Sequence, residues 1–151
     1  MLPKKKCMSN PYQKYKSTQI TSASKEKLLL MMYEGAIKFT KVAIKAAEEK
    51  KIAERCESIG RAFDIVLELN NTLDHKVGGE ISVKLEQLYM YMTEQYSKAN
   101  ISGSSEPLKI NLKLLETLYD GWVQAVEKIK KDESAKASLK MQEDKGDKKA
   151  G

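Results

Sequence analysis

The sequence contains few of the residues that interrupt helices and strands, form disulfides or bind metal ions. Its 151 residues include 3 prolines, 8 glycines, 2 cysteines and 1 histidine. So little turn-forming material argues against the many short strands of an all-β fold. Cys7 and Cys56 lack the spacing of a zinc knuckle or a redox pair, so neither a disulfide nor a metal site is expected. A single histidine also excludes a ferritin-like di-iron bundle, which needs two Glu-x-x-His pairs.

Long apolar runs and a basic surface are missing as well. No segment approaches the ~18 consecutive apolar residues of a membrane span, and polar residues follow residues 1–6 where a signal peptide would have its apolar core. We therefore expect a cytoplasmic protein with no membrane insertion. Of the net charge of +6, five lysines lie before Ser24, where there is no acid. The rest of the chain lacks the basic face of a nucleic-acid-binding protein.

Four long amphipathic patterns make up most of the chain, at about residues 25–50, 52–77, 80–100 and 107–131. Ser24 is a good N-cap for the first pattern. The apolar residues of the second and fourth recur at alternating steps of three and four, as in near-antiparallel helix packing. Gly78 and Gly79 predict a helix C-cap and a tight reversal, after which Glu80 opens the third helix. The predicted fold is an all-α, antiparallel four-helix bundle.

The two ends of the chain differ from this central part. Residues 1–9 are predicted to be a flexible leader, residues 10–131 the helical-bundle domain, and residues 132–151 a disordered tail. The tail balances five lysines with five acids and has only Leu139 and Met141 as large apolar residues. Such a segment buries too little surface to offset the entropy lost on ordering.

Candidate catalytic residues are scarce. His75, beside Gly78 and Gly79, is a candidate site of a histidine phosphotransfer bundle, although such a site ordinarily lies in the middle of a helix. The alternative is an exposed histidine at a helix C-terminus. Cys56 fits the apolar seam of the second helix as a small core residue. No nucleophile elbow, phosphate loop or ligand-spaced cluster is present, so we expect neither enzymatic activity nor a cofactor.

The second and fourth patterns carry more apolar width than one packed face requires. The surplus is covered either in a tightly packed or dimeric structural bundle, or by an amphipathic segment of a partner that enters a hydrophobic groove. The predicted groove consists of residues left over once the bundle seams are assigned: Ile65, Leu69, Ile110, Leu114 and Leu118.

Several segments, in order, resemble the flagellar export chaperone family FliS. They are residues 10–15 (NPYQKY), 27–36 (KLLLMMYEGA), 67–74 (LELNNTLD), 78–81 (GGEI), 88–92 (LYMYM), 99–100 (AN) and 120–122 (DGW). The resemblance covers about residues 10–130. It implies a non-enzymatic cytoplasmic chaperone that binds the disordered C-terminal segment of flagellin, prevents premature polymerisation and assists delivery to the flagellar type III export gate. A regulatory co-chaperone is a further expected partner.

The resemblance also implies a role for the N-terminal segment. In this family it acts as a strap over part of the apolar surface that flagellin takes, and the matching residues here are Asn10, Pro11, Tyr12 and Tyr15. The sequence departs from the family pattern at three positions. Lys25 stands where proline is usual, Met90 where an acid is usual, and Gly121 where alanine is usual, so local packing near the last two is expected to differ.

Overall fold

The computed structural model of the chain describes residues 24–150, with side chains as far as residue 146. All regular structure in this part is helical and falls into four helices: α3 (Lys25–Glu48), α4 (Ile52–Asn71), α5 (His75–Ser102) and α6 (Glu106–Ala150). The predicted all-α class is confirmed. The leader, and the strap residues Asn10, Pro11, Tyr12 and Tyr15, lie outside the described residues.

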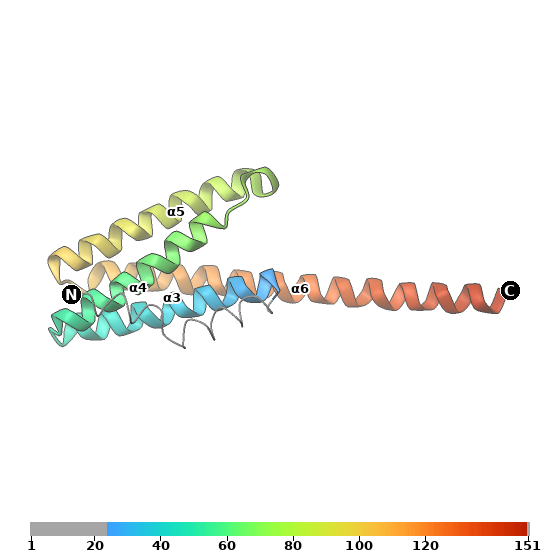
Figure 1. Ribbon diagram of the computed structural model, residues 1–151, viewed down its shortest axis with the longest axis horizontal. Coiled ribbons are helices and arrows are strands. Elements are labelled where there is room, and N and C mark those ends of the chain that lie inside the picture. Colours follow the sequence, from blue (N-terminus) through green and yellow to red (C-terminus); the bar gives the residue numbers. More distant parts are fainter. Residues whose placement is uncertain (1–23, 151) are drawn as a thin grey trace, which may run out of the picture.

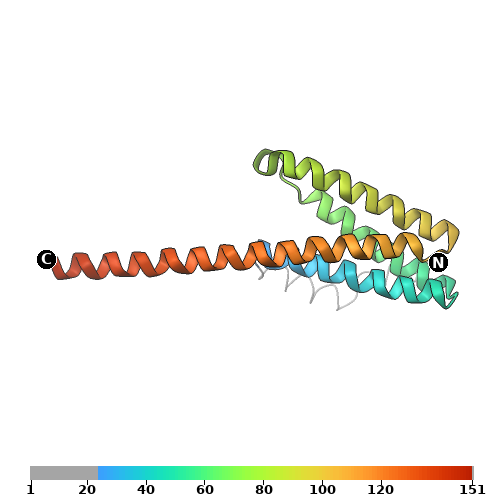
Figure 2. The same ribbon diagram turned by 180° about the vertical axis from the view of Figure 1, so that it is seen from behind.

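Consecutive helices run in opposite directions (Figure 1). α3 packs against α4 and α6, and α5 packs against the same two helices. Figures 1 and 2 both show that α4 and α5 diverge from the α3–α6 pair toward the connection between them, while α6 continues well past the bundle. No described helix is long and apolar enough to cross a membrane.

α3 begins as predicted, because Ser24 Oγ accepts a hydrogen bond of 3.2 Å from the backbone N–H of Lys27. Its buried side contains four alanines, at positions 36, 43, 46 and 47. Such small side chains let neighbouring helices approach α3 closely. α3 accordingly packs against two neighbours, α4 and α6.

Buried polar side chains on α3, α5 and α6 form hydrogen bonds between the helices. The hydroxyls of Tyr33 and Tyr89 share a hydrogen bond of 2.5 Å, and those of Thr40 and Tyr96 share one of 2.7 Å. Asn111 Nδ2 on α6 donates to the carbonyl oxygen of Met92 at 2.9 Å. Because buried hydroxyls need partners, these bonds help to specify how α3, α5 and α6 align.

The connection between α4 and α5 differs from the prediction. α4 ends at Asn71, before the glycines, and Asp74 then caps α5 by accepting from the N–H groups of Lys76 (3.0 Å) and Val77 (3.2 Å). This side-chain acceptor starts the new helix early. The break predicted at the glycines before Glu80 is present, because Gly79 interrupts the helical backbone of α5 with φ of 51° and ψ of −122°. His75 therefore occupies the first turn of a helix, not the last.

The prediction of a disordered tail is not confirmed, since α6 continues to Ala150. Lysine and alanine, both strong helix formers, are the most frequent favourable residues in this segment, and proline is absent from it, so the helix begun in the bundle can propagate outward. Every described side chain from 127 to 146 is nevertheless exposed. The expectation that the segment buries little surface is met.

Candidate functional site

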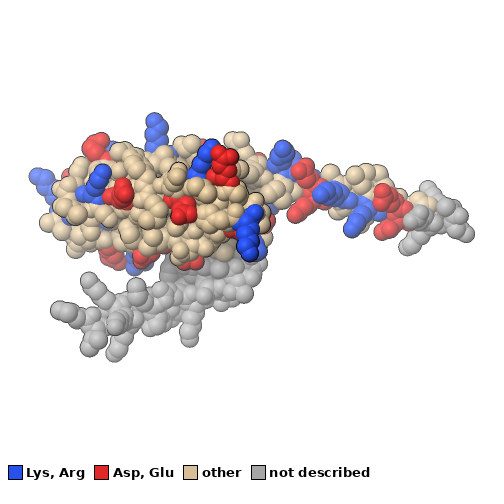
Figure 3. Space-filling model, turned by 90° about the horizontal axis from the view of Figure 1, so that it is seen from above, with Lys and Arg blue, Asp and Glu red and all other residues tan. Residues whose placement is uncertain are grey.

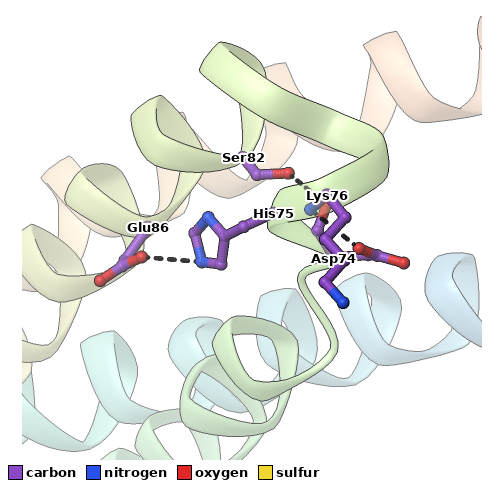
Figure 4. A network of polar contacts seen from close by, with 5 residues as sticks. All are labelled: Asp74, His75, Lys76, Ser82 and Glu86. Atoms are coloured by element: carbon purple, nitrogen blue, oxygen red, sulfur yellow. Dashed lines mark hydrogen bonds and ion pairs between the residues drawn. The ribbon is translucent and has the colours of Figure 1, made fainter.

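The candidate catalytic residues occupy ordinary structural positions. His75 Nε2 lies 3.0 Å from Glu86 Oε2, and both side chains are about half exposed (Figure 4). Cys56 is exposed, so its assignment to the core is wrong. The buried row of α4 contains Ile59, Ala62 and Val66 and leaves Cys56 to one side. Within the described residues, no three His, Cys, Asp or Glu side chains gather as a metal site would require.

The five residues of the predicted groove do not line one surface. Leu69 is only 1% exposed and belongs to the core. Ile65 faces α3, because a Cβ placed on Gly35 would lie 3.2 Å from its Cδ1. Helices α4 and α6 each pack on α3 and on α5 and form no extensive interface with each other. Residues of α4 and α6 were paired in the prediction because periodicity reports the face of a helix but not the neighbour that this face meets.

The three α6 residues of the prediction share one side of that helix. Asn111 bonds to α5, and Leu114 and Leu118 follow it at the helical spacing of three and seven residues. They therefore border α5. The other side of α6 is tied to α3, where Tyr119 donates to Glu34 Oε1 at 2.6 Å.

Helix α5 completes this surface. Arg55 of α4 donates to the carbonyl oxygen of Asn100 at 3.2 Å, so the C-terminal end of α5 lies against α4. Asn111 of α6 donates to the carbonyl oxygen of Met92, so α5 borders α6 near Met92, with Tyr91 as its sequence neighbour and Leu88 one turn earlier. We define the α5–α6 surface by the apolar residues that border this seam from both helices: Leu88, Tyr91, Ile110, Leu114 and Leu118.

The α5–α6 surface combines anchored and exposed side chains. Leu88, Leu114 and Leu118 are partly buried and pack against the core, whereas Tyr91 is 40% exposed and Ile110 43% exposed. Figure 3 looks onto the molecule from the side on which α5 lies in Figure 1, and charged side chains are few and scattered over the bundle in that view. Leu88 and Tyr91 were not among the predicted groove residues, because the surplus apolar width was assigned to the second and fourth patterns; their apolar character was the available signal.

The residues buried in the core of the bundle are uncharged. Burial raises the pKa of the Tyr89 phenol well above its usual range, and burial raises that of Tyr96 to about 12. Both phenols therefore remain neutral at physiological pH. At the edge that faces α3, the hydrogen bond to the Glu34 carboxylate raises the pKa of Tyr119. This arrangement suits apolar contact.

Comparisons with known proteins agree over most of the chain. A family-wide sequence profile described as "Flagellar protein FliS" matches residues 8–129. The "Flagellar secretion chaperone FliS" of Bacillus subtilis (strain 168) is 30% identical over 125 residues, which cover 83% of this chain and 92% of that protein. The protein of the same name from Campylobacter jejuni (serotype O:6) is 31% identical over 111 residues, covering 74% and 87%.

A solved structure gives an independent comparison of fold. The "Crystal structure of flagellar chaperone from bacteria" superposes with a TM-score of 0.65 at 20% sequence identity, covering 77% of this chain and 94% of that one. At this identity the likeness concerns the arrangement of the helices alone.

Proposed function

Because the chain belongs to the FliS family of flagellar secretion chaperones, we propose that it binds the C-terminal segment of flagellin in the cytoplasm. It keeps flagellin from polymerising before export and assists its delivery to the flagellar type III export gate. The protein acts by binding and not by catalysis. A regulatory co-chaperone that meets the same complex is a further partner under this proposal.

The observation that carries the proposal is the α5–α6 surface, which is apolar, partly exposed and backed by a well-packed core. A disordered cargo segment loses conformational entropy when it orders on a partner, at a cost of roughly 2 to 5 kcal/mol. Extended apolar contact supplies free energy to offset that cost. Tyr91 and Ile110 project from the two helices that border the seam, so an amphipathic segment lying along it would contact both.

The experiment measures binding of a flagellin C-terminal peptide to the full chain by calorimetry. Ile110→Glu places a charge on the surface at a position already 43% exposed, so the bundle should fold normally. We expect at least tenfold weaker binding, which corresponds to about 1.4 kcal/mol. Ile52→Glu is the matched control, because Ile52 is 65% exposed on α4, away from the α5–α6 surface.

Three outcomes are informative. Weaker binding in Ile110→Glu alone supports the assigned surface. Normal binding by Ile110→Glu would place the cargo elsewhere on the molecule. No binding of flagellin by the unaltered chain would contradict the function itself. Leu118→Glu is a poorer test, because Leu118 packs against the core and a charge there would also disturb folding.

The other two functions expected from sequence gain no support. Phosphotransfer at His75 would require an accessible ring nitrogen, and Nε2 is already paired with the Glu86 carboxylate, whose negative charge opposes an incoming phosphoryl group. A purely structural dimer would not explain why the chain matches a family of secretion chaperones.

A further inference from the structure

Helix α5 buries one polar side chain whose polar group has no partner among the described residues. Gln95 is only 6% exposed, and its amide forms no hydrogen bond within residues 24–146. Because buried polar side chains are nearly always hydrogen-bonded, this exception needs an explanation. The other polar side chains that α5 buries all have partners: Ser82 bonds to Asp74, Thr93 to Met90, Tyr89 to Tyr33 and Tyr96 to Thr40.

Gln95 lies on the side of α5 that faces α6. Ser82 bonds to the connection between α4 and α5, and Thr93 lies three turns further along the same side of the helix. Two residues correspond to about 200° around a helix, so Gln95 points away from this side. Asn111 of α6 donates to the carbonyl oxygen of Met92 at 2.9 Å, and Gln95 follows Met92 by one turn.

The amide of Gln95 is held at the edge of the buried region. In the described part of the chain, four side-chain atoms are fully buried without a partner, on Arg55, Asn70, Asn111 and Trp122, and the amide atoms of Gln95 are not among them. The small accessible part of Gln95 therefore includes its amide. Its aliphatic stem is buried, so the side chain has already lost rotamer freedom in the folded protein. A donor and an acceptor are thus presented in a fixed position.

This amide lies within the α5–α6 surface. Tyr91 precedes Gln95 by one turn on α5 and is 40% exposed. Ile110, which is 43% exposed, immediately precedes Asn111, the α6 residue that bonds to α5 at Met92. The two most exposed residues of the surface therefore lie near the amide on the two helices, and a segment that contacts both passes over it.

Building on the proposed function, we propose that Gln95 binds the main chain of the cargo segment where that segment crosses between Tyr91 and Ile110. A carboxamide offers both a donor and an acceptor, which match the two polar groups of a peptide unit. Peptide groups inside a helix are bonded to one another, whereas those at a helix end are free. Gln95 therefore holds the cargo at a point where its helix begins, ends or is interrupted, and so sets the register of the segment along the surface.

Gln95→Met tests this role, because methionine is an unbranched, flexible side chain that can fill the same space without an amide. Binding of a flagellin C-terminal peptide to the full chain would be measured by calorimetry. We expect about fivefold weaker binding, which corresponds to about 1 kcal/mol, the net value of one hydrogen bond. The melting temperature should be unchanged or higher, since no described residue loses a partner. A purely structural role for Gln95 would give the opposite pattern, with normal binding and a lower melting temperature.

Thr93→Val is the matched control. Thr93 is also 6% exposed on α5, but it lies on the α4 side and its hydroxyl bonds within its own helix at 2.7 Å. Peptide binding by this variant should equal that of the unaltered chain. Gln95→Leu serves as a second apolar replacement if Gln95→Met does not fold.

The group that Gln95 binds can be found with esters in the flagellin peptide. Replacing a single peptide bond with an ester removes its N–H group and weakens its carbonyl acceptor. At one position the ester should weaken binding to the unaltered chain about fivefold and leave binding to Gln95→Met unchanged, because the two changes remove the same interaction. If no position behaves in this way, Gln95 does not bind the cargo main chain.

These measurements distinguish the role of Gln95 from the proposed function. Normal binding by Gln95→Met, together with weaker binding by Ile110→Glu, would overturn the role of Gln95 and leave the cargo surface in place. No binding of the peptide by the unaltered chain would contradict the function and the role of Gln95 together. Weaker binding by Gln95→Met with an unchanged melting temperature, and normal binding by Thr93→Val, is the expected result.

Discussion

At the scale of single residues, the core is specified by polar pairs as well as by apolar packing. Tyr33 and Thr40 on α3 are seven residues apart, and so are their partners Tyr89 and Tyr96 on α5. A shift of α5 along its axis would break both bonds and leave several buried hydroxyls without partners. Because each unsatisfied buried group costs free energy, the two pairs together favour a single register between these helices.

Replacing one member of the Tyr33–Tyr89 pair should show this coupling. Tyr33→Phe and Tyr89→Phe each leave one buried hydroxyl unpaired, and each should lower the free energy of unfolding by about 1 to 3 kcal/mol. The double variant removes both hydroxyls and should lose less than the sum of the two single losses. Urea denaturation of the three variants measures these quantities. Strictly additive losses would mean that the hydrogen bond contributes nothing to specificity.

At the scale of secondary-structure elements, four glycines that lie within helices or at a helix end have different structural roles. Gly79 and Gly103 have positive φ angles, of 51° and 74°, at the kink of α5 and at its C-cap. Gly60 and Gly121 lie inside α4 and α6, and an added Cβ at either would meet nothing within 4 Å. Only the first two are needed for the backbone conformation.

Alanine substitutions should separate these roles. Gly60→Ala and Gly121→Ala should each raise the free energy of unfolding by about 0.5 to 1 kcal/mol, because glycine is the weaker helix former. Gly79→Ala should lower it by about 1 kcal/mol or more, since alanine rarely adopts the required angles. Thermal unfolding followed by circular dichroism compares the three. A destabilised Gly121→Ala protein would show that this glycine has a packing role that the described residues do not reveal.

At the scale of the whole molecule, α6 belongs to two different environments. Its first part packs on α3 and α5, with Leu108, Asn111 and Leu115 fully buried. Beyond Val126 every described side chain is exposed, so helical propensity and continuity with the packed part maintain the helix there. Order in this segment does not imply a contribution to the stability of the bundle.

Removal of residues 132–151 tests that distinction. The truncated protein should lose helical circular dichroism signal in proportion to the residues removed, because they are helical. Its melting temperature should stay within a few degrees of the full chain, a change of less than roughly 1 kcal/mol for a domain of this size. A larger drop would show that the segment contacts the bundle.

Prediction of the site failed at particular residues for a common reason. Leu69 and Cys56 were assigned from the apolar periodicity of α4, yet Leu69 is buried and Cys56 is exposed. The periodicity gave the approximate face, but a residue at the edge of a face is buried or exposed according to the neighbouring helix. For the same reason, periodicity did not show that Ile65 meets α3 whereas Leu114 lies on the α5 side of α6.

The sequence by itself determined the helical class, the approximate positions of the four helices, the Ser24 cap and the break at Gly79, because these depend on contacts within a few residues along the chain. The tertiary structure decided the contacts between elements, above all the pairing of α5 with α6 at the apolar surface. These features depend on contacts between residues distant in sequence, such as Asn111 with Met92 and His75 with Glu86. The spacing of residues along one helix carries no information about them.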